Sequence, residues 1–237
     1  MNQLEKLARK YQTDKWTIGY TDYYSIWFDK IRNNKLKVLE IGIQSGASIR
    51  MWEEYFPNSM IYGMDIPSPI LEGRQDGVAL PNMESLKSNR IVPFYANQGD
   101  RNGLKKFIDD CGGDFDIIID DGSHFQDDQQ ISWGFLWQYL KPGGLYVIED
   151  IAVPREFYKN REKDDRWGIS DIEKFSDSTF NVILDFIENE RLNSPYMTEK
   201  EQKHITETVE SNGNGKIVKI IQSGVTCFSS IKKMETT

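Results

Sequence analysis

Two short apolar stretches, each ending in a pair of acidic residues, constrain the fold of this chain more than any other feature. The first reads FDIIIDDGSH over residues 115–124, and the second reads LYVIED over residues 145–150. Runs rich in Ile and Val that are bounded by Gly or Asp are typical of strands buried on both faces of a parallel sheet. Ligands of an open α/β sheet bind outside the carboxyl ends of its strands, so the acids that end these strands should lie together. These acids are Asp120, Asp121, Glu149 and Asp150, with His124 beside them.

Four carboxylates packed this closely would repel one another and raise some of their own pKa values. A bound hard cation removes the repulsion, and magnesium or calcium, which take oxygen ligands, suit an all-carboxylate set better than zinc does. The alternative is that strand-end Asp residues cap the helices that follow them, which is common and needs no metal. For a single acid the cap is the better interpretation, but this cluster with a histidine favours a metal-assisted site.

The overall composition limits the class of partner and the number of domains. A chain of 237 residues has room for one α/β domain with a sizeable core, and a net charge of −8 argues against nucleic acid as the main partner. The first residues lack the apolar core of a signal peptide, and no stretch approaches transmembrane length. Cys111 and Cys227 are too few to define a disulfide framework. We therefore expect a soluble cytoplasmic protein without a membrane span, and homo-oligomerisation is left open.

Strands and helices are predicted to alternate along most of the chain. The predicted strands are residues 37–42, 60–65, 90–95, 114–120 and 145–149. The predicted helices are residues 2–11, 22–32, 48–56, 103–110 and 127–140, and Asp22 is a candidate N-cap of the second helix. This alternation indicates a parallel doubly wound α/β sheet. After the fifth strand we expect helices at residues 175–191 and 198–210 and a β-hairpin around Ser223–Gly224.

The N-terminal segment combines a polar motif with an aromatic cluster. The motif is TDK at Thr13–Lys15, for which a solvated loop is the default interpretation. The aromatic residues that follow are most simply a helix face that packs on the domain. They are Tyr20, Tyr23, Tyr24, Trp27 and Phe28.

The turn after the first strand indicates a nucleotide site. Glu40, Gly42 and Gly46 occupy the strand, the turn and the helix start; glycines let the backbone approach a ligand, and the helix directs free N–H groups at it. Asp65, 23 residues after Gly42, ends the next strand, where an acid can accept hydrogen bonds from both ribose hydroxyls. The spacing alone does not separate a dinucleotide from another adenosine ligand. The turn reads GIQSGA rather than GxGxxG, and no GKS or GKT is present, which excludes a P-loop.

Several longer motifs resemble one family. KYQTDKW and GYTDYY, then VLEIGIQSGASIRMWEEYFPNSMIYGMDI, IIDDGSH and LKPGGLYVIEDI resemble class I S-adenosylmethionine-dependent methyltransferases, and within them the macrocin/mycinamicin sugar O-methyltransferases. The resemblance covers roughly residues 7–151. It implies a seven-stranded Rossmann-like sheet, parallel with a C-terminal antiparallel hairpin, in a single domain over 1–237. Residues 1–34 would form an N-terminal helical cap, 35–150 the cofactor and metal core, and 151–237 the acceptor-side cover.

The resemblance also implies residues that contact the methyl donor. Asn97 stands where the group often has an acid, and its amide oxygen could still accept a hydrogen bond from the adenine amine. Gln44 replaces the middle glycine of the commoner turn, which puts the usual cofactor affinity in question. The expected cofactor-binding residues are Lys15, Tyr20, Glu40, Gly42, Gly46, Ser48, Asp65, Asn97, Gln98 and Asp120.

For the reaction, the resemblance implies that Asp121, Glu149 and Asp150 are magnesium ligands and that His124 is the general base, with Asp121 also catalytic. The chemistry agrees, because a neutral alcohol is a poor nucleophile, a metal lowers its pKa, and a base of near-neutral pKa can take its proton. His204, the second histidine, lies in a charged helical stretch and is expected at the surface.

The favoured function is therefore a magnesium-assisted O-methyltransferase that uses S-adenosylmethionine and acts on a hydroxyl of a sugar, a nucleotide-linked sugar or a glycoconjugate. Another small-molecule acceptor, such as a catechol-like diol or an amine, stays open, as does a non-catalytic module that binds an adenosine ligand. A dehydrogenase is disfavoured by the missing third glycine of the turn. Residues 67–89 and 152–167 leave the carboxyl edge of the sheet and should frame the acceptor site.

Overall fold

The computed structural model describes residues 1–66, 83–151, 177–209, 211–212, 215–216, 218–223 and 226–234. Most of the predicted excursion at 67–89 and all of the segment at 152–176 lie outside the described residues. Within the described part, no helix has the length and apolar character needed to cross a membrane.

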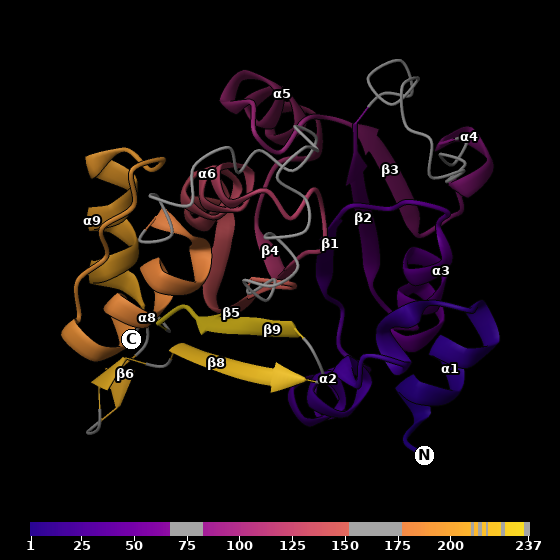
Figure 1. The fold of residues 1–237 in the computed structure, drawn as a ribbon. Coiled ribbons are helices and arrows are strands. Elements are labelled where there is room, and N and C mark those ends of the chain that lie inside the picture. Colours follow the sequence, from indigo (N-terminus) through magenta and orange to yellow (C-terminus); the bar gives the residue numbers. More distant parts are fainter. Residues whose placement is uncertain are drawn as a thin grey trace, which may run out of the picture.

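A seven-stranded mixed sheet forms the centre of the molecule, which confirms the predicted fold class (Figure 1). Its strand order is β3-β2-β1-β4-β5-β9-β8; the first five strands pair in parallel, and β9 pairs antiparallel with both β5 and β8. The chain turns in opposite directions from the adjacent strands β1 and β4, which makes their carboxyl ends the expected ligand site. The strands are β1 Lys37–Ile41, β2 Met60–Asp65, β3 Ile91–Tyr95, β4 Phe115–Asp120, β5 Leu140–Ile148, β8 Val218–Ser223 and β9 Thr226–Lys232.

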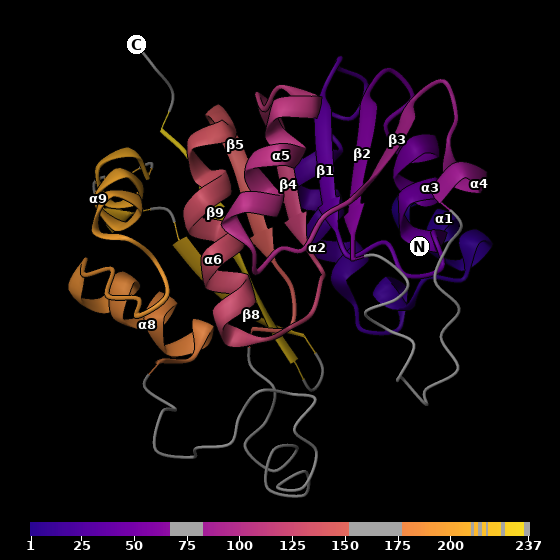
Figure 2. The same cartoon turned by 90° about the horizontal axis from the view of Figure 1, so that it is seen from above.

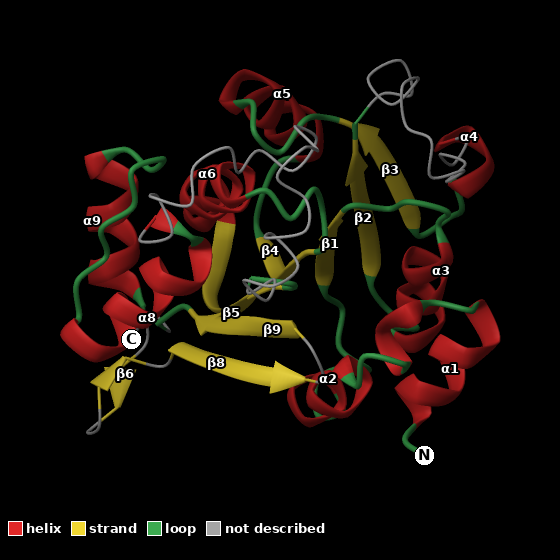
Figure 3. Cartoon of the chain, in the orientation of Figure 1, coloured by secondary structure: helices red, strands yellow, loops and turns green. Residues whose placement is uncertain are grey.

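Helices cover both faces of this sheet, as Figures 2 and 3 show. One hydrophobic cluster contains residues of α5, α6, α8 and α9, and a second contains residues of α1, α2 and α3. Strand β4 serves both, because Ile118 belongs to the first cluster while Ile117 and Ile119 belong to the second. The helices are α1 Gln3–Tyr11, α2 Tyr20–Phe28, α3 Ala47–Tyr55, α4 Met83–Leu86, α5 Arg101–Cys111, α6 Gln126–Leu136, α8 Thr179–Asn189 and α9 Glu199–Thr208. The 3-10 turns η1 Asp14–Trp16 and η3 Trp137–Tyr139 and a small hairpin, β6 Ser211–Asn212 with β7 Gly215–Lys216, complete the described elements.

Two predicted helix boundaries were wrong for identifiable reasons. Helix α2 begins after Gly19, whose φ of 88° only glycine adopts readily, so Asp22 lies in the first turn instead of capping it. The predicted helix at 127–140 ends at Leu136 and passes through η3 into β5, which already begins at Leu140. Strand β5 accommodates Pro142 because its pairing with β4 is irregular there, where a missing backbone N–H costs little.

The N-terminal segment lies against the carboxyl edge of the sheet. Lys15 of η1 contacts acids that follow β4 and β5, and Tyr20 at the start of α2 contacts Asp150 after β5. These contacts join the beginning of the chain to its core. The division into a helical cap, a core and an acceptor-side cover stays a prediction.

Candidate active site

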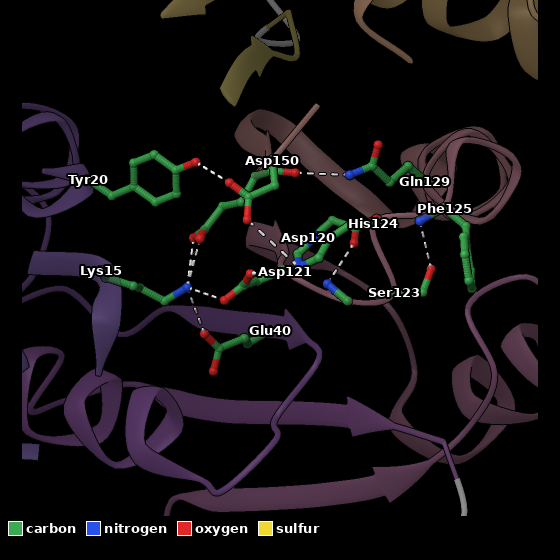
Figure 4. A network of polar contacts seen from close by, with 12 residues as sticks. Lys15, Tyr20, Glu40, Asp120, Asp121, Ser123, His124, Phe125, Gln129 and Asp150 are labelled. Atoms are coloured by element: carbon green, nitrogen blue, oxygen red, sulfur yellow. Dashed lines mark hydrogen bonds and ion pairs between the residues drawn. The ribbon is translucent and has the colours of Figure 1, made fainter. Parts of the chain in front are cut away.

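A single buried ammonium group lies among three carboxylates at the carboxyl edge of the sheet (Figure 4). Lys15 is 1% exposed, and its Nζ donates to Asp121 Oδ2 at 2.5 Å and to both oxygens of Glu149 at 2.8 and 3.0 Å. Its distance to Glu40 Oε1 is 3.7 Å. The Thr13 hydroxyl accepts from the backbone N–H of Lys15 and caps η1, which fixes where the lysine enters the site. The TDK motif is therefore part of the site rather than a solvated loop.

The charges in this cluster do not balance. Burial alone would lower the pKa of Lys15, but the surrounding carboxylates of Asp121, Glu149 and Glu40 outweigh it and raise this pKa well above its usual value. Burial and the nearby charge of Asp121 raise the pKa of Glu149. One ammonium group is thus shared by three acids, and a fourth acid, Asp150, lies nearby. The excess of negative charge favours a further cation at this edge of the sheet.

Two tyrosines of α2 hydrogen-bond Asp150 and Glu149. The Tyr20 hydroxyl donates to Asp150 Oδ1 at 2.6 Å, and the Tyr24 hydroxyl donates to Glu149 Oε1. The two tyrosines are four residues apart and therefore lie on one face of the helix. Sequence reasoning treated this aromatic cluster as a packing face and missed Tyr24; the polar tips of buried tyrosines, spaced by four, were the signal that pointed to a second role.

His124 faces the two acids that are held by the N-terminal segment. Its Nε2 lies 3.9 Å from Asp121 Oδ1 and 3.8 Å from Asp150 Oδ2. The three side chains are between 23% and 25% exposed, so they remain accessible to small molecules. Both His124 and Asp150 have left-handed backbone conformations, with φ of 60° and 52°. Such conformations are uncommon for residues other than glycine and concentrate at functional sites.

The donor set fits a divalent cation. One ligand atom from each of Asp121, His124 and Asp150 lies within 4.8 Å of the others, which allows a single ion to contact all three. Two carboxylates are suitable ligands for a hard cation such as Mg²⁺, and the imidazole could serve as a ligand or remain outside the coordination sphere. Glu149, the third predicted ligand, instead directs its oxygens to Lys15 and Tyr24.

A buried hydrogen-bond network supports the loop that carries His124. Gln98 Nε2 donates to Asp120 at 3.1 Å while its Oε1 accepts from the backbone N–H of Ser123 at 2.8 Å. Asp120 also accepts from the Ser132 hydroxyl at 2.6 Å, and burial raises the pKa of this carboxyl to about 6. Gln98 and Asp120 thus hold the loop of residues 121–124 from beneath, and their predicted contact with the cofactor stays a prediction.

The glycine turn after β1 packs directly on that loop. A Cβ atom at Gly42 would lie 2.1 Å from the backbone oxygen of Asp121, and φ at this glycine is 85°. Gly46, with φ of 80°, starts α3 and would carry a Cβ only 2.4 Å from Leu86. Side chains are therefore excluded at both positions, and the turn of residues 42–46 and the loop of residues 121–124 are in contact.

Glu40 and Asp65 accept hydrogen bonds from their own surroundings. Glu40 is buried and accepts from the Ser48 hydroxyl at 2.8 Å and the indole N–H of Trp52 at 2.9 Å, and burial raises its pKa to about 7. Ser48, predicted to contact the cofactor, donates to Glu40 in this structure. Asp65 Oδ2 accepts from the backbone N–H groups of Ile43 and Gln44, both at 2.9 Å. The hydrogen bond from Trp52 to Glu40 was not predicted from the sequence.

The remaining predicted residues are dispersed around this edge. Asn97 is exposed after β3, and its Oδ1 accepts from the backbone N–H of Gly99. The structure thus brings Lys15, Tyr20, Glu40, Asp121, Glu149, Asp150 and His124 into one network, while Asp65 and Asn97 lie at the ends of β2 and β3.

Comparison with known proteins places these features in context. No protein-family model matches the chain. Demethylmacrocin O-methyltransferase of Streptomyces fradiae is 34% identical over 157 residues, covering 62% of this chain and 36% of that protein. Mycinamicin VI 2''-O-methyltransferase of Micromonospora griseorubida is 35% identical over 160 residues, with the same two shares. The match thus spans about a third of the length of these curated relatives.

Solved structures agree with the fold. The MycE methyltransferase of the mycinamycin biosynthetic pathway, solved with Mg, S-adenosylhomocysteine (SAH) and mycinamycin VI, has a TM-score of 0.69 at 24% identity, covering 99% of this chain and 54% of that one. A second crystal form with Mg and SAH gives the same TM-score at 25% identity. The chain has the methyltransferase fold, and the predicted resemblance to macrocin/mycinamicin sugar O-methyltransferases is confirmed.

Proposed function

We propose that this chain, similar in fold and sequence to the macrocin/mycinamicin sugar O-methyltransferases, transfers a methyl group from S-adenosylmethionine to a hydroxyl of a sugar or glycoconjugate. The observation that carries the proposal is the arrangement of His124 beside Asp121 and Asp150, at 3.9 and 3.8 Å, next to the glycine turn of a methyltransferase fold. A non-catalytic adenosine-binding module would not need a histidine facing two accessible acids.

The acids at this edge would hold one divalent cation, most simply Mg²⁺. Asp121 and Asp150 present ligand atoms within 4.8 Å of each other and of His124, while the oxygens of Glu149 are held by Lys15 and Tyr24. When bound, the cation would lower the pKa of an acceptor hydroxyl and orient it. The donor set fits a hard cation because its oxygen atoms carry excess negative charge that Lys15 neutralises only in part.

His124 would act as the general base. Its Nε2 faces the two acids and would accept the hydroxyl proton as the acceptor oxygen attacks the methyl carbon of the sulfonium. The carbon–oxygen bond forms as the carbon–sulfur bond breaks, and SAH leaves with the electron pair. Asp121 would take part as a ligand of the cation beside this base, because its Oδ1 lies 3.9 Å from His124 Nε2.

The glycine turn would bind the methyl donor. Gly42 and Gly46 let this turn pack closely on Asp121 and Leu86, and the first turn of α3 would direct free N–H groups at the donor. Asp65 would accept hydrogen bonds from the ribose hydroxyls while it holds the turn through Ile43 and Gln44. Asn97, exposed beyond β3, is available for the adenine.

The sugar acceptor is supported by the relatives. Two further relatives are L-olivosyl-oleandolide 3-O-methyltransferase of Streptomyces antibioticus and a methyltransferase of Streptomyces olivaceus named for a rhamnosyl tetracenomycin; each name places the modified position on a glycosylated compound. Vicinal hydroxyls of a sugar also suit a site with two accessible carboxylates and a cation, because a diol can chelate a metal.

Two measurements test this function in sequence. Calorimetry should show that the protein binds SAH, and binding of NAD without SAH would contradict the methyltransferase proposal. Turnover of labelled S-adenosylmethionine should then be screened against nucleotide sugars and simple glycosides, with catechols and amines as comparison acceptors. Methylation of a glycoside that requires Mg²⁺ supports the proposal, whereas turnover only with an amine would redirect it to another acceptor class.

A further inference from the structure

We propose that Tyr20 is a positioning residue of the cation site: its hydroxyl holds one oxygen of Asp150 so that the other oxygen faces His124. The proposal rests on the proposed function, since it concerns the same divalent cation. It differs from the cofactor contact expected from the sequence, because the partner of Tyr20 is a carboxylate of the chain itself.

The two accessible acids are held in the same way by the N-terminal segment. Tyr20 donates to Asp150 Oδ1 at 2.6 Å, and Lys15 donates to Asp121 Oδ2 at 2.5 Å. In each case the second oxygen is the one that faces His124 Nε2, at 3.8 Å for Asp150 Oδ2 and 3.9 Å for Asp121 Oδ1. The donors Tyr20 and Lys15 therefore influence which oxygen each acid presents to the shared site (Figure 4).

Tyr20 is itself held rigidly, as a positioning residue must be. The left-handed conformation of Gly19 starts α2 and places Tyr20 at its first position. The side chain is fully buried, and its ring packs edge-on against Tyr24 with centroids 6.4 Å apart. A buried aromatic ring has little rotational freedom left to lose, so its hydroxyl is a fixed point against which the shorter Asp150 side chain is aligned.

Loss of the hydroxyl should leave Asp150 in place but remove the hydrogen bond that holds its Oδ1. The carboxylate could then turn its oxygens away from His124, and a cation would have to restore the orientation on binding. Partners that orient metal ligands typically contribute about 10- to 100-fold to metal affinity. Tyr20→Phe removes only the oxygen and leaves the buried ring and the net charge of the site unchanged, so the effect can be assigned to orientation.

The experiment titrates Mn²⁺ into the full chain, monitored by electron paramagnetic resonance, with SAH calorimetry and thermal unfolding on the same samples. Tyr20→Phe should weaken Mn²⁺ binding by about 10- to 100-fold while SAH affinity stays unchanged. The matched control is Tyr55→Phe: the Tyr55 hydroxyl donates to Asp29 Oδ1 at the same distance of 2.6 Å, in the second hydrophobic cluster. This control should bind Mn²⁺ like the wild type.

Each outcome decides the proposal. Equal Mn²⁺ affinities for the wild type and Tyr20→Phe would overturn the positioning role while leaving the proposed function intact. Weaker SAH binding with unchanged Mn²⁺ binding would overturn it in favour of the cofactor contact. No Mn²⁺ binding by the wild type would refute the cation site itself and the positioning role with it, whereas SAH binding would still support the methyltransferase.

Discussion

The acids on the two halves of the sheet's carboxyl edge differ in burial and in hydrogen bonding. On the side proposed to bind the cofactor (the cofactor side), Glu40 is fully buried and accepts from Ser48 and Trp52, and Asp65 accepts from backbone N–H groups of the adjacent turn. On the side proposed for catalysis (the catalytic side), Asp121 and Asp150 are about a quarter exposed, and each directs one oxygen toward His124 without a direct hydrogen bond.

This difference indicates that the two halves have different roles, one in binding the cofactor and one in holding a cation. The cofactor side is completed by groups of the chain itself and needs only a ligand that fits the glycine turn. On the catalytic side, Lys15 neutralises only part of the negative charge of the acids, so a bound cation would complete the charge balance. A preformed half and a half whose acids suit a cation are consistent with the metal-assisted methyl transfer that we propose.

The largest expected effect is on the catalytic side. His124→Ala should lower the turnover of labelled S-adenosylmethionine by about 10²- to 10⁴-fold, because the general base is lost. The residual rate should rise with pH, as hydroxide replaces the missing base, while SAH affinity stays unchanged. His204→Ala, in α9, is the control and should retain full turnover. Near wild-type turnover of His124→Ala would show that His124 is not the general base.

Removing Lys15 should disturb both halves at once. Lys15→Met leaves buried carboxylates without their cation, which should lower the free energy of unfolding by about 3–5 kcal/mol in urea titrations. Lys105 forms an exposed pair with Asp109, and Lys105→Met should leave stability nearly unchanged. A stability of Lys15→Met equal to that of the wild type would mean that the ammonium group is not what joins the N-terminal segment to the site.

The buried acid of the cofactor side should show a distinctive pH dependence. Burial raises the pKa of Glu40 from 4.5 to about 7, so its ionisation opposes folding, and stability is lost as pH rises through that window. In urea titrations with EDTA, we compare the free energy of unfolding of the wild type with that of Glu40→Gln. The difference between them should fall by about 3 kcal/mol as the pH rises from 4.5 to about 7. A difference that is flat with pH would show that Glu40 ionises as an exposed acid does.

A smaller effect is expected at Asp65. Asp65→Ala should weaken SAH binding in calorimetry by about tenfold or more, because charged hydrogen-bond acceptors contribute strongly to binding. Circular dichroism should show the fold retained. Asp109→Ala, on the exposed side of α5, should bind SAH like the wild type. Unchanged SAH affinity in Asp65→Ala would remove Asp65 from the cofactor site.

The sequence predicted the parts of this site that depend on local pattern. Strand β2 at Met60–Asp65 has the predicted bounds, and the acids that follow β4 and β5 converge because parallel strands end at one edge. The partners of Lys15 were not predictable, because they lie 106 and 134 residues away in the sequence and no local rule connects them. Gln98 and Asp120 illustrate the same limit, since burial beneath a loop depends on tertiary packing.

Direct titration of the chain with Mn²⁺, in the presence of SAH, tests the central claim that the catalytic half is completed by a cation. We predict a single Mn²⁺ ion per chain that excess Mg²⁺ displaces. Binding should be lost in Asp121→Ala and in Asp150→Ala, and retained in His124→Ala, because the imidazole is reserved for the proton. Loss of binding in His124→Ala would make the histidine a ligand instead of the base. No binding by the wild type, or unchanged binding in Asp121→Ala, would contradict the account.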